Sequence, residues 1–155
     1  GGNIPKEFIP SVQKGFEDSL TDGSKFVNAC VLHNNQDPYC VALIVPDKGA
    51  LKEAVEAKGL NADSEEGKKA MLEILQGEVN SYKKGGRHEG MFPERWLPSA
   101  IGVCDEEFTI ANRMMNSTSK IVRGKVEEHY ASLLEYLYTA EGKNLINPRN
   151  IAALG

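Results

Sequence analysis

The 155-residue sequence predicts an α+β domain, in which a small antiparallel or mixed sheet of about three strands packs with helices. Two β-rich apolar runs lie close together early in the chain, at 26–32 and 39–46, and a third follows at 99–104. Longer segments with apolar residues at helical spacing surround these runs. The length suits one ordinary domain, which buries about two-thirds of the surface of its unfolded chain.

The segment before the first strand is predicted to be a helix. Pro10 suits the first helical position, where its fixed φ angle fits and its missing N–H is not needed. One side of this helix carries Val12, Phe16 and Leu20. A turn at 21–23 then leads to the first strand, and the segment HNNQDP joins the two early strands like a hairpin loop. The nearly continuous hydrophobicity of both strands predicts central positions in the sheet.

Two helices are expected between the second and third strands. Asp47 is placed to cap a helix that stops at Gly59, and Asp63 with Glu66 resembles a capping box that starts the next one, which ends at Gly85-Gly86. The first helix buries Leu51, Ala54 and Val55. The second places Met71, Leu75, Val79 and Tyr82 on one side.

The rest of the chain is predicted to contain a connector, one strand and one long helix. Residues 90–98 (GMFPERWLP) are expected to form a rigid connector into the third strand, with the alternative that Phe92 and Trp96 face a partner domain. A helix over 123–138 carries apolar residues at helical spacing: Val126, Tyr130, Leu133, Leu134 and Leu137. The tail after Tyr138 is expected to be irregular, either docked or frayed.

Composition and charge exclude several classes of function. A hydrophobic content of 41% and a charged fraction of 26% fit a globular protein. The net charge of −4 argues against generic nucleic-acid binding. No apolar run approaches the roughly 20 residues that span a bilayer, and the start GGNIPKEF lacks the regions of a signal peptide. We therefore expect a cytoplasmic protein with no transmembrane segment and no nucleic-acid partner.

The residues that most often hold metals are scattered. The three cysteines lack CxxC spacing and lie in apolar stretches, so we interpret them as buried thiols: Cys30, Cys40 and Cys104. The histidines occur without a neighbouring histidine or cysteine at ligand spacing, and no metal site is predicted: His33, His88 and His129. Glycine pairs at 85–86 and 1–2 are more simply a helix C-cap and a turn than phosphate cradles.

The segment NRMMNSTSKIVRGK at 112–125 carries the main functional signal. It presents Lys120 on a polar turn just ahead of the last helix, and Ser117, Thr118 and Ser119 add hydroxyl donors beside it. An ammonium on a flexible stem can reach a carboxylate or phosphoryl oxygen as negative charge develops there. Taken alone, the run is more simply explained as the solvated start of a surface helix.

Three stretches carry a family resemblance: residues 34–59, 92–109 and 112–126. From about Ser24 to the end, the chain resembles the small C-terminal domain of AMP-forming acyl-CoA synthetases, most closely the long-chain fatty acid–CoA ligases. The stretch at 112–126 looks like the family's last core motif, in which a Thr-Pro-Thr or Thr-Pro-Ser-Gly sequence precedes a lysine. Arg113 stands where a glycine is usual, and Ser117 where the proline is.

The resemblance implies the role of a lid in a two-step reaction. ATP and a fatty acid form an acyl-adenylate and pyrophosphate, and the thiol of CoA then displaces AMP. The motif lysine, Lys120 here, bridges the carboxylate and the phosphates in the first step, with Thr118, Ser119 and Arg123 as substrate- or phosphate-supporting residues. The large N-terminal adenylation domain, absent from these residues, is the implied partner and holds most of the ATP and Mg²⁺ site. The chain alone is therefore expected to bind no cofactor and to be inactive.

The first residues allow two interpretations. Gly1 to Pro5 resemble the turn after the family's hinge, which makes Gly1 and Gly2 candidates for lining the CoA channel. Residues 1–16 resemble even more closely the start of domain IV of elongation factor G. We therefore divide the sequence into 1–23, a post-hinge or chimaeric segment, and 24–155, the adenylate-forming C-terminal domain. The alternative function is a non-enzymatic, translation-factor-like binding module.

Overall fold

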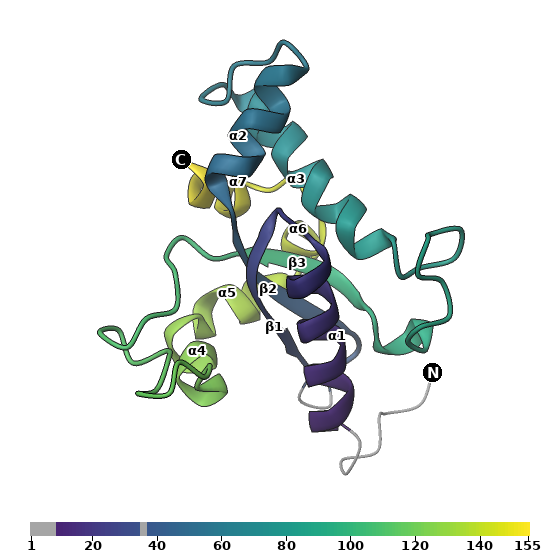
Figure 1. Ribbon diagram of the computed structural model, residues 1–155, viewed down its shortest axis with the longest axis vertical. Coiled ribbons are helices and arrows are strands. Elements are labelled where there is room, and N and C mark those ends of the chain that lie inside the picture. Colours follow the sequence, from purple (N-terminus) through teal and green to yellow (C-terminus); the bar gives the residue numbers. More distant parts are fainter. Residues whose placement is uncertain (1–8, 35–36) are drawn as a thin grey trace.

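The computed structural model describes residues 9–34 and 37–155, which form a mixed sheet between helices (Figure 1). The elements in chain order are α1 (Ile9–Gly23), β1 (Val27–His33), β2 (Cys40–Pro46), α2 (Lys48–Ala57), α3 (Glu65–Asn80), the 3₁₀ helix η1 (Glu94–Trp96), β3 (Pro98–Val103), α4 (Arg123–His129), α5 (Ala131–Leu137), α6 (Ala140–Lys143) and α7 (Pro148–Leu154). The predicted α+β class and the mixed three-stranded sheet are confirmed. No helix in the described part of the chain is long and apolar enough to cross a membrane.

The sheet has the strand order β1-β2-β3. β1 and β2 pair antiparallel, with Leu32 opposite Ala42, while β2 and β3 run parallel, with Ala42 opposite Ile101. Every residue of β2 is buried, as expected for a central strand. The prediction that β1 is also central was wrong, because the third strand adds beside β2 and leaves β1 at the edge.

Both edges of the sheet are closed by side chains. At β1, the carboxylate of Glu17 accepts a hydrogen bond from Leu32 N at 2.6 Å, and Gln13 Nε2 donates to Leu32 O at 3.1 Å. At β3, the buried side chain of Asn150 accepts from Val103 N at 3.0 Å and donates to Ile101 O at 2.9 Å. Exposed strand edges invite pairing with other chains, so these side chains protect the sheet.

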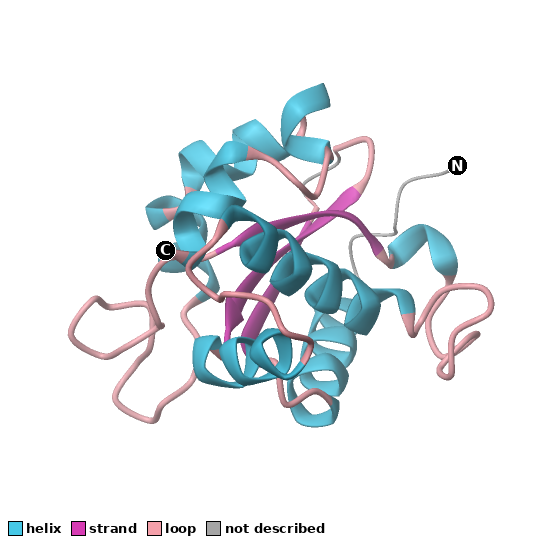
Figure 2. Cartoon of the chain, turned by 90° about the horizontal axis from the view of Figure 1, so that it is seen from above, coloured by secondary structure: helices cyan, strands magenta, loops and turns pink. Residues whose placement is uncertain are grey.

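Alternate residues of each strand point to opposite faces, and helices cover both faces (Figure 2). On one face, Leu32, Ala42 and Ile44 pack with buried side chains of α1, α2, α3 and α7. On the other face, Val41 and Leu43 pack with buried side chains of α4 and α5. The sheet is therefore the middle of three layers. One outer layer consists of α4 and α5, and the segment that carries Lys120 leads into α4 along the chain.

Three of the predicted helix boundaries differ from the structure. α1 continues through Gly23, so the predicted turn at 21–23 is helical. The N-cap of α3 is Ser64 and not Asp63, because the Ser64 hydroxyl accepts from Gly67 N at 3.0 Å. α3 ends at Asn80, five residues before the predicted glycine pair.

The pair Gly85-Gly86 is therefore not the C-cap of α3. Gly85 has φ +88°, and a Cβ on Gly86 would lie 2.4 Å from the carbonyl oxygen of Ser81. The chain here folds back over the end of α3, where His88 N donates to Ser81 O at 2.7 Å. Glycine is required for this close approach rather than for ending the helix.

The C-terminal third is more helical than predicted. The single helix expected over 123–138 is broken at Tyr130, which has φ −104° and ψ 23° and whose hydroxyl donates to Asp105 at 3.0 Å. The tail, expected to be irregular, forms α6 and α7. Asn147 caps α7 by accepting from Asn150 N at 2.9 Å, so the tail is docked on the core.

The connector before β3 packs against the core. The ring of Phe92 lies 5.9 Å from that of Phe16 and 5.8 Å from that of Tyr82. Phe92 and Trp96 are both half-buried, whereas the side chain of Met91 is 51% exposed. Of the two alternatives from the sequence, the structure supports the connector.

Candidate functional site

Lys120 lies near the tip of an exposed loop between β3 and α4, drawn in green in Figure 1. The loop folds as a short hairpin, in which Met115 and Ile121 form an antiparallel bridge. At its tip, Asn116 N donates to Lys120 O at 2.9 Å. The polar turn predicted from the sequence therefore has a defined backbone, and the side chain of Lys120 is exposed on it.

One side chain that the sequence reasoning did not single out organises this tip. Oδ1 of Asn116 accepts from Thr118 N at 3.0 Å, from Lys120 N at 3.0 Å and from the Thr118 hydroxyl at 2.8 Å. Ser119 adopts the left-handed conformation, with φ +60°, and its N–H donates to Asn116 O at 2.9 Å. Asparagine readily forms such turns with its own neighbouring backbone, which is the signal that could have found it.

A second left-handed residue lies earlier in the loop. Arg113 has φ +68°, and its N–H donates to Ile110 O at 3.0 Å. The left-handed conformation costs a residue with a Cβ about 1–2 kcal/mol, and glycine escapes this cost. The resemblance places a glycine at this position, and the φ angle gives the physical reason.

Arg123 begins α4, and its side chain contacts α1 and β1. Its guanidinium contacts Glu17 at 2.7 and 2.8 Å and donates to Leu32 O at 3.0 Å. Burial lowers the pKa of Arg123, but the hydrogen bonds and charge of Glu17 outweigh it and raise that pKa above its ordinary value. The structure thus brings Lys120, Thr118 and Ser119 together and engages Arg123 elsewhere; its phosphate-supporting role stays a prediction.

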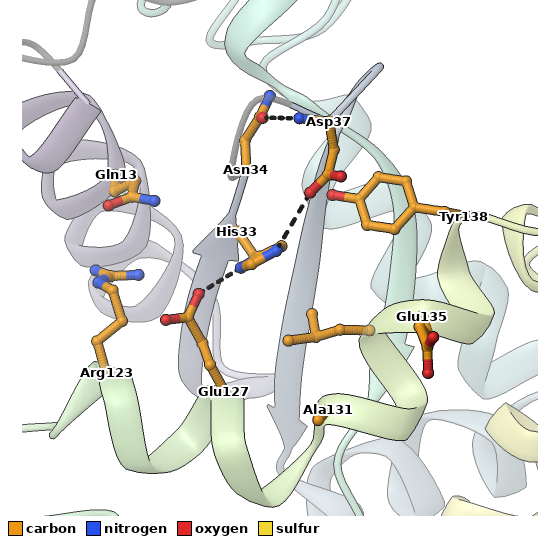
Figure 3. Close-up of a pocket in the computed structure, with 10 residues that line it drawn as sticks. Gln13, His33, Asn34, Asp37, Arg123, Glu127, Ala131, Glu135 and Tyr138 are labelled. Atoms are coloured by element: carbon orange, nitrogen blue, oxygen red, sulfur yellow. Dashed lines mark hydrogen bonds and ion pairs between the residues drawn. The ribbon is translucent and has the colours of Figure 1, made fainter.

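An open pocket of about 610 Å³ lies beside this ion pair, between α1, the end of β1 and the α4–α5 layer (Figure 3). His33 bridges two carboxylates there: Nδ1 contacts Glu127, and Nε2 lies 3.5 Å from Asp37. The sequence reasoning treated His33 as an isolated histidine, because Glu127 is distant in the chain. The residues that line this pocket do not include Lys120.

The other predicted site features are the first two glycines, the absence of a metal site and the buried thiols. Gly1 and Gly2 lie outside the described residues. Within 9–34 and 37–155, no three His, Cys, Asp or Glu side chains are grouped to hold a metal. The interpretation of the cysteines as buried thiols is confirmed for Cys30, Cys40 and Cys104.

A plant acyl-CoA synthetase is similar in sequence to most of this chain. The chain is 28% identical over 133 residues to long chain acyl-CoA synthetase 8 of Arabidopsis thaliana, covering 82% of this chain and 18% of that protein. No protein-family model matches the chain.

Two solved structures have a similar fold. The A-PCP didomain of carboxylic acid reductase from Segniliparus rugosus, in complex with AMP, superposes with a TM-score of 0.58 at 26% identity, over 81% of this chain and 16% of that one. The adenylation domain of the carboxylate reductase from Mycobacterium chelonae gives 0.56 at 21% identity, over 84% of this chain and 17% of that one.

By its fold and by these similarities, the chain resembles a domain of the AMP-forming adenylation type. The resemblance to the C-terminal domain of AMP-forming enzymes is confirmed by a relative in the acyl-CoA synthetases and by the adenylation domains of carboxylate reductases. The chain spans less than a fifth of the length of each of these relatives.

Proposed function

We propose that this chain is the lid domain of a long-chain fatty acid–CoA ligase and that it supplies Lys120 to the adenylation step. The observation that carries the proposal is the position of Lys120, which is exposed near the tip of an ordered loop. In the sequence resemblance, Lys120 corresponds to the motif lysine of the family. The long-chain acyl-CoA synthetase relative supports the choice of a fatty acid as the substrate.

In the proposed step, a carboxylate oxygen of the fatty acid attacks the α-phosphorus of ATP. A bond forms between that oxygen and the α-phosphorus. The bond from the α-phosphorus to the oxygen that bridges the α- and β-phosphates breaks, and pyrophosphate leaves with the electron pair of that bond. Lys120 remains an ammonium and stabilises the charge on the carboxylate and phosphate oxygens without transferring a proton. Ser119, exposed beside it, offers its hydroxyl group to the same phosphates. The hydroxyl of Thr118 donates to Asn116 in this structure and would have to leave that bond to donate to a phosphate.

A lysine on a lid stabilises charge only when the lid closes on bound substrates. We place the fatty acid, most of the ATP site and Mg²⁺ on a large adenylation domain, as the resemblance to acyl-CoA synthetases implies. CoA enters in the second step, for which Gly1 and Gly2 remain candidate contacts. A cytoplasmic location is part of the same proposal, as is the division of the chain at residues 23 and 24.

The translation-factor-like alternative receives no specific support. Within the resembling segment 1–16, the side chains of Gln13 and Phe16 are buried against β1 and the core, whereas Ser11 and Lys14 are exposed. The two buried side chains are used inside this fold and are not presented to a partner.

The test is fatty-acid-dependent ATP–pyrophosphate exchange by a long-chain acyl-CoA synthetase whose C-terminal domain is replaced by this chain. Lys120→Ala is expected to lower the exchange rate at least 100-fold, the usual loss when one preorganised charge-stabilising group is removed. Lys52→Ala, an exposed lysine on α2, is the matched control and should leave the rate unchanged. An unchanged rate with Lys120→Ala would dismiss the proposal.

A further inference from the structure

We propose that Asn116 is the positioning residue for Lys120, so that the side-chain oxygen of Asn116 sets where the ammonium of Lys120 is presented. Its catalytic consequence rests on the proposed adenylation function. Its structural part rests on the loop alone.

Both backbone groups of Lys120 are bound to Asn116. Lys120 N donates to Asn116 Oδ1 at 3.0 Å, and Lys120 O accepts from Asn116 N at 2.9 Å. These two bonds, one from the side chain and one from the backbone, close the tip into a ring. The Cα of Lys120 is therefore fixed relative to Asn116, and only the torsions of the lysine side chain remain to place its ammonium.

The same oxygen also orders the residues between them. Asn116 Oδ1 accepts from both the N–H and the hydroxyl of Thr118, at 3.0 and 2.8 Å. Ser119, directly before Lys120, is held at φ +60°, which is unfavourable for a residue with a Cβ. Removing the oxygen should release Ser119 to common backbone conformations, and the direction in which Lys120 leaves the loop would change with it.

The tip has no buried core to hold it in place. Residues 116–121 are all exposed, so hydrogen bonds rather than apolar packing define their conformation. Asn116 makes all three side-chain bonds through its oxygen. An aspartate at this position would keep these acceptor bonds, and an alanine would remove them. A serine has a shorter side chain, whose hydroxyl oxygen would accept weaker bonds from the same groups.

The structural arm of the test uses the chain alone. Backbone ¹⁵N order parameters and water-exchange rates of residues 117–120 are measured by NMR in the wild type, Asn116→Ala and Asn116→Asp. The alanine variant should lower the order parameters and speed exchange of the Thr118 and Lys120 amides at least fivefold, while the aspartate variant stays close to wild type. Unchanged amides in the alanine variant, or equal changes in both variants, would overturn the proposal.

Asn144→Ala is the matched control for this arm. Asn144 is also exposed in a loop, and its side-chain oxygen accepts from Ile146 N at 3.1 Å. Its loss should change amides near residue 146 and leave residues 117–120 as they are. A response of the Lys120 loop to Asn144→Ala would show that the loop senses general destabilisation, which contradicts a local role for Asn116.

The catalytic arm uses the long-chain acyl-CoA synthetase whose C-terminal domain is replaced by this chain. Asn116→Ala should lower kcat for adenylation about tenfold with little change in KM for ATP, and Asn116→Ser should restore part of it. CoA transfer from preformed acyl-adenylate, which does not need Lys120 in the proposed mechanism, should be unchanged. A lower rate of that transfer would overturn the catalytic part.

A double variant separates the two proposals. In the Lys120→Ala background, Asn116→Ala should cause no further loss, because Asn116 acts through Lys120. An equal further loss would show that Asn116 acts in another way. If Lys120→Ala alone leaves adenylation intact, the proposed function fails, while the NMR arm still decides whether Asn116 holds the loop.

Discussion

Glu17 and Arg123, 106 positions apart in the chain, form a two-point ion pair, with guanidinium nitrogens 2.7 and 2.8 Å from the two carboxylate oxygens. The same carboxylate accepts from Leu32 N, and the same guanidinium donates to Leu32 O. One ion pair thus joins α1, the edge of β1 and the start of α4. Because α4 follows Lys120 within three residues, this junction anchors the exit of the Lys120 loop.

We expect Glu17→Ala to lower the free energy of unfolding by about 3 kcal/mol, the lower end of the range for breaking a buried pair. The loss arises because Leu32 N is left without its acceptor and Arg123 loses its carboxylate partner, keeping only the bond to Leu32 O. The side chain of Glu17 is only 11% exposed, whereas that of Arg123 is 33% exposed, which moderates the loss. The measurement is urea unfolding followed by circular dichroism.

The matched control for Glu17→Ala lies on the same helix. Lys14 pairs with Asp18 at 3.2 Å, but the side chain of Lys14 is 78% exposed. Lys14→Ala should cost about 1 kcal/mol or less, since exposed pairs contribute little. Equal small losses for Glu17→Ala and Lys14→Ala would contradict the role given to the junction.

Asn150→Ala should destabilise the domain by about 3–5 kcal/mol, because each buried group left unsatisfied costs roughly 1–3 kcal/mol. The lost side chain serves Val103 N, Ile101 O and Leu145 O, and Asn150 is fully buried. Thermal unfolding of Asn150→Ala beside Asn144→Ala measures the difference. If both variants have the same midpoint of thermal unfolding, the hydrogen bonds of Asn150 to the β3 edge do not stabilise the domain.

Arg113→Gly should stabilise the protein by about 0.5–1 kcal/mol. Glycine removes the cost of the left-handed conformation at φ +68°, although it also gains entropy in the unfolded chain. Lys52→Gly, at an exposed position inside α2, should instead cost about 1 kcal/mol. A loss of stability with Arg113→Gly, measured in the same urea series, would refute the strain at this residue.

The three cysteines should be inert to thiol reagents in the folded protein. Burial raises the pKa of Cys30, of Cys40 and of Cys104, so the reactive thiolate is scarce at pH 8 and the reagent cannot reach it. Labelling with a chromogenic disulfide should therefore follow unfolding and reach three thiols per chain in denaturant. Rapid labelling of the folded chain would mean that at least one of these thiols is accessible.

The elements that depend on local chemistry were predictable from the sequence. The three strands, the Asp47 cap and the polar turn carrying Lys120 follow from hydrophobic runs and capping residues, which act within a few positions. The break at Tyr130 was not predictable, because the apolar spacing continues in phase across it while the hydrogen bond to Asp105 comes from another part of the chain.

The candidate site follows this division only in part, because one local feature was missed as well as a long-range one. The sequence identified Lys120 and its hydroxyl neighbours but passed over Asn116, whose bonds span only two and four residues. It gave Arg123 a substrate- or phosphate-supporting role, which stays a prediction, but it did not reveal that Arg123 pairs with Glu17. A pairing over 106 positions leaves no periodic signal, so only the fold reveals it.

The measurement that tests the lid assignment most directly is fatty-acid-dependent ATP–pyrophosphate exchange, with this chain alone and with a separately produced large domain of a long-chain acyl-CoA synthetase. We expect no exchange by either part alone and exchange on mixing that depends on Lys120. Exchange by this chain alone would contradict the need for a partner domain. Absence of exchange on mixing and in the covalently fused synthetase would contradict the assignment of the chain as a catalytic lid.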